Sequence, residues 1–361
     1  MKSLKIGNLN IPIPIIQGGM GVGVSLSGLA VAVANEGGVG VISCAGLGLL
    51  YRNLSKDYLK ANILGLTEEI TRARKQTKGI IGVNIMVAMS NFADMVKTSI
   101  KEKADIIFAG AGLPLDLPSY RTEGSQTKLV PIVSSGRAVR IICEKWEKNY
   151  HCLPDAVVVE GPKAGGHLGF KPEQIFDENY TLNKLVEAVI NEIRIFEKKY
   201  NKEIPVIAAG GIYTGGDIYS IMESGADGVQ MGTRFVTTDE CDASKEFKQT
   251  YLDAGEKDIG IIKSPVGMPG RAIVNPFIEK VREGKKHPLN CPFKCIRTCD
   301  ISSSPYCIIS ALFNAFRGNL EGGFAFAGSN AFRATKIQSV KDLFEELQEE
   351  YSHTLNEIRE V

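Results

Sequence analysis

Eight short apolar runs, separated by stretches with a helical pattern, constrain the fold of this chain more than any other feature. The runs cover residues 14–16, 38–43, 80–85, 105–109, 129–133, 156–160, 205–209 and 228–231. Most are continuous rather than alternating, which is typical of parallel strands that are buried on both faces. Helices are expected between the runs, over residues 25–36, 67–77, 91–103, 136–148, 183–199 and 216–224.

Strand and helix alternating eight times predict a parallel sheet, and eight such units can close into a TIM (β/α)8 barrel. An open, doubly wound sheet is the alternative. From about residue 263, glycine, proline and cysteine cluster, no further strand is expected, and a final amphipathic helix covers about 340–360. We therefore predict a barrel over residues 1–262 and a C-terminal accessory or cap region over residues 263–361.

The composition argues against several classes of partner and location. The net charge of +1 gives no electrostatic basis for binding nucleic acid or a membrane surface. The longest apolar zone, residues 29–50, is interrupted by Asn35, Glu36 and several glycines, so no membrane span is expected. The chain begins without a long apolar segment, and eight cysteines in 361 residues do not suggest a disulfide-stapled secreted domain. A cytoplasmic location is expected.

The segment EGPKAGGH, residues 160–167, is the strongest candidate for chemistry. It follows an apolar run, and in a barrel the loops after the strands carry function. Gly165 and Gly166 allow bare backbone to approach a flat or phosphorylated ligand, because glycine has no Cβ. His167 then presents an imidazole, which suits proton transfer near neutral pH. The alternative is a structural histidine with both ring nitrogens satisfied.

Two further glycine loops predict a phosphate site. IPVIAAGGI and GADGVQMGTRF, residues 204–212 and 225–235, contain the seventh and eighth runs, after which barrels commonly bind phosphate. Gly210 and Gly211 would allow close approach, while Gly232 and Thr233 would supply N–H groups and a hydroxyl. The alternative is that these glycines serve only as turn residues. No Walker-type lysine motif is present.

Asn84 and the segment GGMGVG, residues 18–23, are weaker signals. The glycines superficially resemble a dinucleotide fingerprint, but their position after the first strand fits a loop against a ligand ring better. Asn84 is an amide inside an apolar run, and a buried amide needs hydrogen-bond partners. It would either bind the edge of a flavin ring or tie two strands together.

Four cysteines of the tail form the pattern C-x3-C-x3-C-x7-C. They are Cys291, Cys295, Cys299 and Cys307. Cysteine clusters can hold zinc or iron–sulfur centres, but this spacing is not the usual paired C-x2-C and contains Pro292. Free structural cysteines are the alternative, and no metal is assigned to the chain.

Taken together and in order, these motifs resemble the nitronate monooxygenase family, once called 2-nitropropane dioxygenases. The resemblance rests on PIIQGGMG, GVNIM, EGPKAGGHLG, AAGGI and GADGVQMGTRF. That family includes the FMN-dependent enoyl-acyl-carrier-protein reductases of type II. The resemblance covers roughly residues 1–240 and resumes weakly in GRAIVN (270–275) and FAFAGSNAFR (324–333).

The resemblance implies a TIM barrel that binds FMN and needs no metal for its chemistry. Gly19 and Met20 would pass beside the isoalloxazine, and Asn84 and Glu160 would contact the ring or the ribityl chain. His167 would be the catalytic histidine. The remaining cofactor-binding residues, most of them toward the ribityl phosphate, would be Gly165, Gly166, Gly210, Gly211, Gln230, Met231, Gly232 and Thr233. The chain departs from the family pattern at Lys163, where an acid is usual, and in its longer cysteine-bearing tail.

The leading functional interpretation is oxidation of alkyl nitronates by FMN and O2. Where a neutral nitroalkane is the substrate, His167 would act as the base that removes the α-proton. The alternative is NAD(P)H-dependent reduction of an enoyl thioester, because GAGLP, residues 110–114, resembles the GAGNP of the reductases. Both interpretations give the enzyme a small-molecule substrate.

Two other classes of protein share fewer of these features. An IMP-dehydrogenase-type barrel needs a nucleophilic cysteine in the loop after the sixth strand, where this chain has His167. A non-catalytic flavin or redox-sensing protein would find its main support in the tail cysteines. The sequence leaves open NAD(P)H as a reductant and a homodimer as the assembly.

Overall fold

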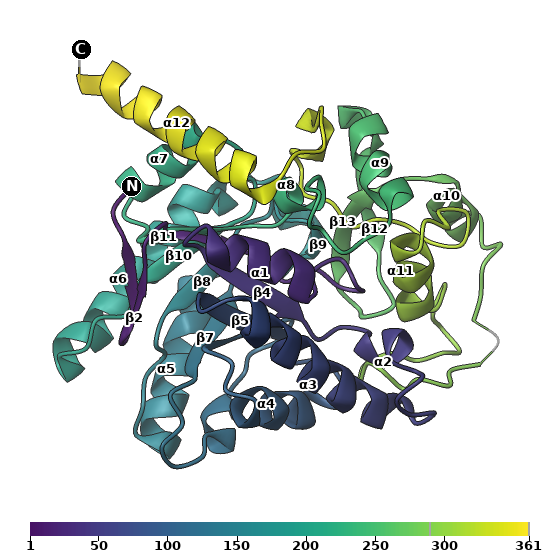
Figure 1. Ribbon diagram of the computed structural model, residues 1–361, viewed down its shortest axis with the longest axis horizontal. Coiled ribbons are helices and arrows are strands. Elements are labelled where there is room, and N and C mark those ends of the chain that lie inside the picture. Colours follow the sequence, from purple (N-terminus) through teal and green to yellow (C-terminus); the bar gives the residue numbers. More distant parts are fainter. Residues whose placement is uncertain (289, 360–361) are drawn as a thin grey trace.

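Eight parallel strands close into a barrel in the computed structural model, which describes residues 1–288 and 290–359. The strands are β3 (Ile15–Gln17), β4 (Val39–Ser43), β5 (Ile80–Met86), β6 (Ile106–Gly110), β7 (Lys128–Val133), β8 (Val157–Glu160), β10 (Val206–Ala209) and β11 (Gly228–Met231). Each pairs with the next, and β11 pairs with β3 to close the ring. All eight predicted runs are therefore strands, and the TIM barrel is confirmed (Figure 1).

Helices surround the barrel at the predicted places. They are α1 (Ser27–Asn35), α3 (Tyr58–Gln76), α4 (Phe92–Lys101), α5 (Gly136–Tyr150), α6 (Leu182–Tyr200) and α7 (Gly215–Glu223). Helix α3 begins nine residues before the predicted start because Asp57 caps it, its carboxylate accepting from the N–H groups of Leu59 and Lys60. The short α2 (Leu47–Leu50) precedes it.

The last helix, α12 (Val340–Arg359), packs on the barrel. It lies against α7 and α1 (Figure 1), and it buries Leu343, Phe344 and Leu347. The helix that directly follows the eighth barrel strand, α8 (Thr233–Val236), has only four residues. Helix α12 therefore covers the gap in the outer helical layer that α8 is too short to fill.

A hairpin at the start of the chain packs against the interior of the barrel. Its strands are β1 (Leu4–Ile6) and β2 (Leu9–Ile11), paired antiparallel. Leu4, Ile6 and Ile11 are almost fully buried and share one apolar cluster with inward-facing barrel residues such as Ile16 and Phe108. The barrel is thus a packed core, as expected for this fold.

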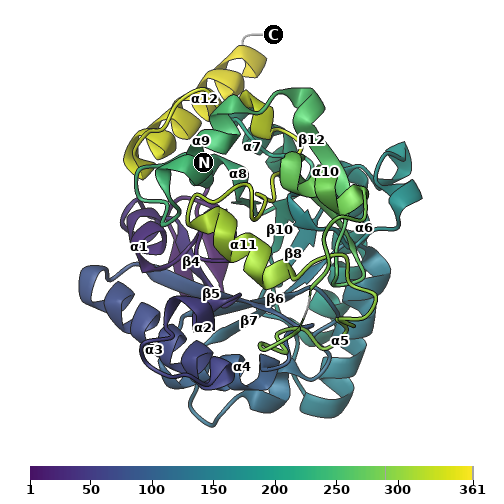
Figure 2. The ribbon, with the colours of Figure 1, turned by 90° about the vertical axis from the view of Figure 1, so that its right-hand side faces the viewer.

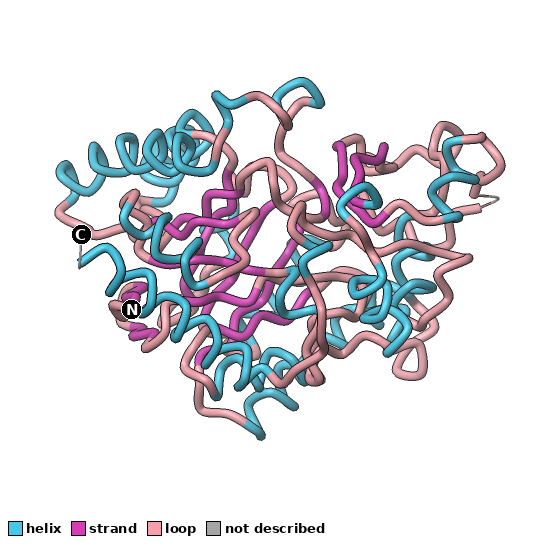
Figure 3. Tube along the Cα trace, turned by 90° about the horizontal axis from the view of Figure 1, so that it is seen from above, coloured by secondary structure: helices cyan, strands magenta, loops and turns pink. Residues whose placement is uncertain are grey.

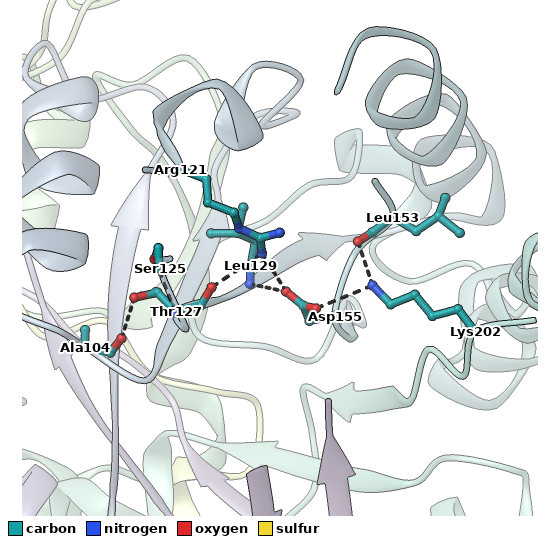
Figure 4. Close-up of polar contacts among 8 residues, drawn as sticks. All are labelled: Ala104, Arg121, Ser125, Thr127, Leu129, Leu153, Asp155 and Lys202. Carbon is teal, nitrogen blue, oxygen red and sulfur yellow. Dashed lines mark hydrogen bonds and ion pairs between the residues drawn. The ribbon is translucent and has the colours of Figure 1, made fainter. Parts of the chain in front are cut away.

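Aspartates tie neighbouring strands together where the strands begin. Figure 4 shows Asp155, whose carboxylate accepts from the N–H of Leu129 at 2.9 Å and pairs with Arg121 at 3.0 Å and Lys202 at 3.4 Å. Two other aspartates repeat the contact with the preceding strand: Asp105 accepts from the N–H of Ile81 at 2.8 Å, and Asp227 from that of Val206 at 2.9 Å.

The C-terminal part of the chain forms a cap that contains strands, which corrects the expectation that none follow residue 263. Strands β12 (Ile259–Lys263) and β13 (Pro269–Ile273) form a small sheet with β9 (Gly166–His167), apart from the barrel strands in Figure 3. The sequence of β13 does not read as an apolar strand, because Arg271 lies in its middle. That arginine is buried at 5% exposure, its charge being satisfied by backbone carbonyls.

Three helices complete the cap: α9 (Lys245–Asp253), α10 (Pro276–Arg282) and α11 (Ile308–Phe316). Figure 2 shows α10 and α11 in front of the barrel strands. Short 3₁₀ turns lie at Leu117–Tyr120, Pro172–Gln174, Glu178–Tyr180, Glu256–Asp258 and Ala331–Arg333. Among the described helices, none combines the length and apolar character that a membrane crossing needs. The division into 1–262 and 263–361 stays a prediction; it would cut through β12.

Candidate active site

One cavity lies where the barrel strands end, and it gathers every residue that the sequence nominated for catalysis or cofactor binding. Residues from the ends of all eight barrel strands line it, together with cap residues. The nominated residues among them are Gly19, Met20, Asn84, Glu160, Gly165, Gly166, His167, Gly210, Gly211, Gln230, Met231, Gly232 and Thr233. Their individual roles stay predictions, but their meeting in one cavity follows from the topology, because parallel strands all end at the same face.

His167 is held by the cap. It lies on β9, whose residues pair with β13, and its Nε2 is 2.7 Å from the hydroxyl oxygen of Ser264. The ring of Phe326 packs against the imidazole with centroids 5.0 Å apart. Burial lowers the pKa of His167 to about 4, so the ring is neutral at neutral pH.

Glu160 and Lys163 bring two more ionisable groups to the cavity. Glu160 ends β8, and burial raises the pKa of its carboxyl to about 7. A substantial fraction of that carboxyl is therefore protonated, and uncharged, at neutral pH. Lys163, the departure from the family pattern, lines the same cavity.

The two glycine loops form one wall. Gly210 and Gly211 have φ values of +96° and +87°, in the left-handed region that favours glycine. The side-chain amide of Asn330 donates to the carbonyl of Gly211 at 2.7 Å, and the N–H of Gly328 donates to the hydroxyl of Thr233 at 3.0 Å. The loops are thus fixed by a segment about a hundred residues further along the chain.

Ser329, in that same segment, has a hydroxyl that is buried yet without a hydrogen-bond partner among the residues that the structure describes. Its backbone N–H donates to the carbonyl of Lys163 at 3.1 Å, and the residue lines the cavity. Because buried hydroxyls are usually paired, an unpaired one at a cavity wall indicates a place for a polar ligand atom.

Asn84 lies directly beneath the first glycine loop. A Cβ added to Gly19 would come within 2.2 Å of the Cβ of Asn84, so only glycine allows the loop to pass this close. The backbone carbonyl of Asn84 accepts from Cys44, while the residue also lines the cavity. This placement is compatible with the predicted ligand contact.

A family model described as nitronate monooxygenase matches residues 2–350. The chain belongs to the nitronate monooxygenase family. The family named from the motifs is therefore confirmed.

Curated relatives and solved structures agree with this assignment. A "probable nitronate monooxygenase" of Staphylococcus haemolyticus (strain JCSC1435) is 27% identical over 98% of each chain, and one of Staphylococcus aureus (strain Newman) is 28% identical over 76% of this chain and 79% of that one. The structure of FabK from Thermotoga maritima has a TM-score of 0.74 at 29% identity, over 97% of this chain and 96% of that chain.

A nitroalkane oxidase from Streptomyces ansochromogenes has a TM-score of 0.72 at 22% identity, over 96% of this chain and 98% of that one, which supports the fold alone. The family and its curated relatives identify the chain as a flavin-dependent oxidoreductase.

Arg271 is a residue of this family member that the sequence analysis did not nominate. Its buried guanidinium donates to the carbonyls of Pro162 and Ala164, the latter at 2.9 Å, and so braces the loop that carries His167. Only the weak match of GRAIVN to the family pointed to it. Likewise, Gly328, Ser329 and Asn330 line the cavity and lie in FAFAGSNAFR, the other segment that matches the family weakly.

The tail cysteines lie in the cap, and all four are unpaired. Cys295 is buried and packs in one apolar cluster with Val22 and Leu49, with Cys307 at its edge. Within the described residues, no group of three cysteine, histidine or acidic side chains is placed to hold a metal ion. Cys295 and Cys307 thus pack beside Val22, which lines the cavity.

Proposed function

We propose that this protein is an FMN-dependent nitronate monooxygenase that oxidises alkyl nitronates with O2. The observation that carries the proposal is the polar lining of the cavity: a lysine, Lys163, and a neutral histidine, His167, among apolar cap side chains such as Leu312 and Phe326. A small organic anion with an alkyl chain suits that lining. The family match and the Staphylococcus haemolyticus relative support the same activity.

The residues fit a flavin with one phosphate. Ser329 offers an unpaired buried hydroxyl beside the two glycine loops. Gly19, Met20 and Asn84 line another part of the cavity, where a flat ring could bind against them. We expect Gly210, Gly211, Gly232 and Thr233 to bind the phosphate, which makes FMN rather than FAD the cofactor. When bound, FMN would supply the redox chemistry between the substrate and O2.

The protein's own side chains would bind and orient the substrate. Lys163 would attract the anionic nitronate. Glu160 would oppose it little, because the raised pKa of that carboxyl reduces its negative charge at neutral pH. Phe326 and Leu312 would keep water from the alkyl part of the substrate.

The unpaired cysteines support the expected cytoplasmic location.

The second candidate, NAD(P)H-dependent reduction of an enoyl thioester, keeps one specific support. Gly110 and Ala111, which begin the GAGLP segment, line the cavity. The enoyl reductase domain of MlnA from Bacillus amyloliquefaciens has a TM-score of 0.69 at 13% identity, over 96% of each chain, which is a likeness of fold alone.

One experiment separates the two functions. The purified yellow protein is mixed anaerobically with NADH, NADPH or propionate 3-nitronate, and the flavin absorbance is followed. We expect bleaching by the nitronate and none by either nicotinamide. Bleaching by NADH or NADPH alone would overturn the proposal in favour of the reductase. Mass spectrometry of the released flavin tests FMN against FAD in the same sample.

A further inference from the structure

Ser264 makes the one hydrogen bond that the His167 ring has within residues 1–288 and 290–359. Its hydroxyl oxygen lies 2.7 Å from Nε2 of that ring. Ser264 follows β12 directly, is only 3% exposed, and lies outside the lining of the cavity, whereas His167 belongs to that lining. The serine therefore holds Nε2 from the protein side, and Nδ1 is the ring nitrogen left without a partner among the described residues.

The direction of this hydrogen bond follows from the remaining contacts of Ser264. A hydroxyl has one proton to donate and two lone pairs that accept. The backbone N–H of Val266 donates to this hydroxyl oxygen at 3.3 Å, which uses one lone pair. The hydroxyl proton still needs an acceptor, because buried donors are rarely left unpaired. In the part of the chain that the structure describes, Nε2 of His167 is the acceptor within reach.

If the serine donates, Nε2 carries no proton. The buried ring is neutral at neutral pH, so its single proton must then be on Nδ1. We propose that Ser264 is a positioning residue that fixes His167 in the neutral form with the proton on Nδ1. The ring then offers a hydrogen-bond donor to the cavity, not the lone pair of a base.

This inference rests on the proposed function. It concerns which protonation state of the substrate the site binds, the anionic nitronate or the neutral nitroalkane. A nitronate is already an anion with charge on its nitro oxygens, and an Nδ1–H donor stabilises that charge. A neutral nitroalkane would instead need a base to remove its α-proton, which requires a free lone pair on the ring. The structure therefore favours preformed nitronates as substrates, opposite to the base role considered from the sequence.

The test reads the tautomer directly, without substrate. Holoenzyme labelled with 15N-histidine is studied at pH 7 by two-bond 1H–15N correlation. The chain has only four histidines, so comparison with His167→Asn identifies the signals of His167. We expect Nδ1 of the protonated type and Nε2 of the unprotonated type. Ser264→Ala should lose this pattern and show protonated Nε2, whereas Ser264→Thr, which keeps a hydroxyl, should retain it.

A matched control is Ser304→Ala, because Ser304 is similarly buried in the cap but donates to the carbonyl of Asp300 at 2.6 Å. It should leave the His167 spectrum unchanged. A wild-type ring protonated at Nε2 would overturn the proposal, as would an unchanged tautomer in Ser264→Ala, and the wild-type spectrum decides even where a variant does not fold. Absence of nitronate turnover would instead count against the proposed function alone.

Discussion

Glu160 and His167, two ionisable residues of the cavity, have shifted pKa values. The two shifts have opposite effects on how the stability of the fold depends on pH. Burial raises the pKa of Glu160 from 4.5 to about 7, so the folded chain binds more protons there than the unfolded chain over that range. Burial lowers the pKa of His167 from 6.5 to about 4, so the folded chain binds fewer. The contribution of Glu160 to the free energy of unfolding therefore decreases as pH rises, whereas the contribution of His167 decreases as pH falls.

We expect these contributions to cancel in part between pH 4.5 and 6.5 in the flavin-free protein. Relative to wild type, Glu160→Gln should make the free energy of unfolding rise with pH, and His167→Asn should make it fall. Each change amounts to roughly 2–3 kcal/mol across its window. Urea unfolding at several pH values measures it, and parallel curves for wild type and both variants would contradict the assignment.

Gly232 provides a test of whether the two glycine loops bind the cofactor. A Cβ added there would meet only Met20, at an ordinary 3.4 Å from its sulfur, and φ is −111°. The methyl group of Gly232→Ala therefore costs the fold little but occupies cavity space. Gly211 is a poorer probe, because its φ is +87° and a Cβ would lie 2.8 Å from the Cβ of Lys163.

We expect Gly232→Ala to weaken flavin binding about tenfold or more, or at least about 1.4 kcal/mol. The free energy of unfolding without flavin should change by less than about 0.5 kcal/mol. Fluorescence titration with FMN measures the first quantity. Gly255→Ala is the control, since a Cβ there also meets an ordinary contact and the residue lies outside the cavity lining. Equal affinity in both variants would remove Gly232 from the cofactor site.

The residues that the sequence nominated for catalysis or cofactor binding share one property: they lie near or after the C-terminal ends of barrel strands, and the topology brings them to one cavity. Ser264, Arg271 and Ser329 could not be found in this way. Each reaches the site from the cap, and each acts through a contact with a loop or side chain far away in the sequence. No local pattern encodes such a contact.

At the level of elements, strands buried on both faces were predictable, and strands made by cap pairing were not. β9 has two residues and exists only because β13 lies beside it. The barrel strands also share a side-chain contact that the apolar pattern does not predict. Asp105, Asp155 and Asp227 each precede a strand, and each accepts a hydrogen bond from a backbone N–H of the strand before it. Each carboxylate fixes the register of one parallel pair at its beginning.

Asp155 tests this role of the carboxylates. Asp155→Ala would leave the N–H of Leu129 unpaired and remove the partner of Arg121 and Lys202. We expect the free energy of unfolding to fall by about 1–3 kcal/mol, with flavin content unchanged because the cavity is at the other end of the strands. Asp155→Asn keeps an acceptor oxygen and should lose less. Chemical denaturation measures both, and an equal loss would assign the effect to charge alone.

For the whole molecule, the cap is part of the site, not an appendage. It supplies Ser264 and Arg271 to the loop of His167, and Gly328, Ser329 and Asn330 to the glycine loops. The change in composition at residue 263 signalled the cap, yet could not reveal that the chain returns to the barrel with α12. That return depends on the shortness of α8, which leaves an outer position for a helix from elsewhere.

Phe344 on α12 tests how far the barrel and the C-terminal region form one cooperative unit. Its ring is 1% exposed and packs against Phe235 of α8 with centroids 6.1 Å apart. Phe344→Ala should lower the free energy of unfolding by about 3–5 kcal/mol, as for other buried phenylalanines. Because α12 lies on the barrel, we expect one unfolding transition that shifts as a whole, seen alike by Trp146 fluorescence in the barrel and by flavin release. Ile358→Ala, at an exposed position of the same helix, should shift neither signal. Separation of the two signals in Phe344→Ala would instead show that residues 1–262 and 263–361 unfold as independent units.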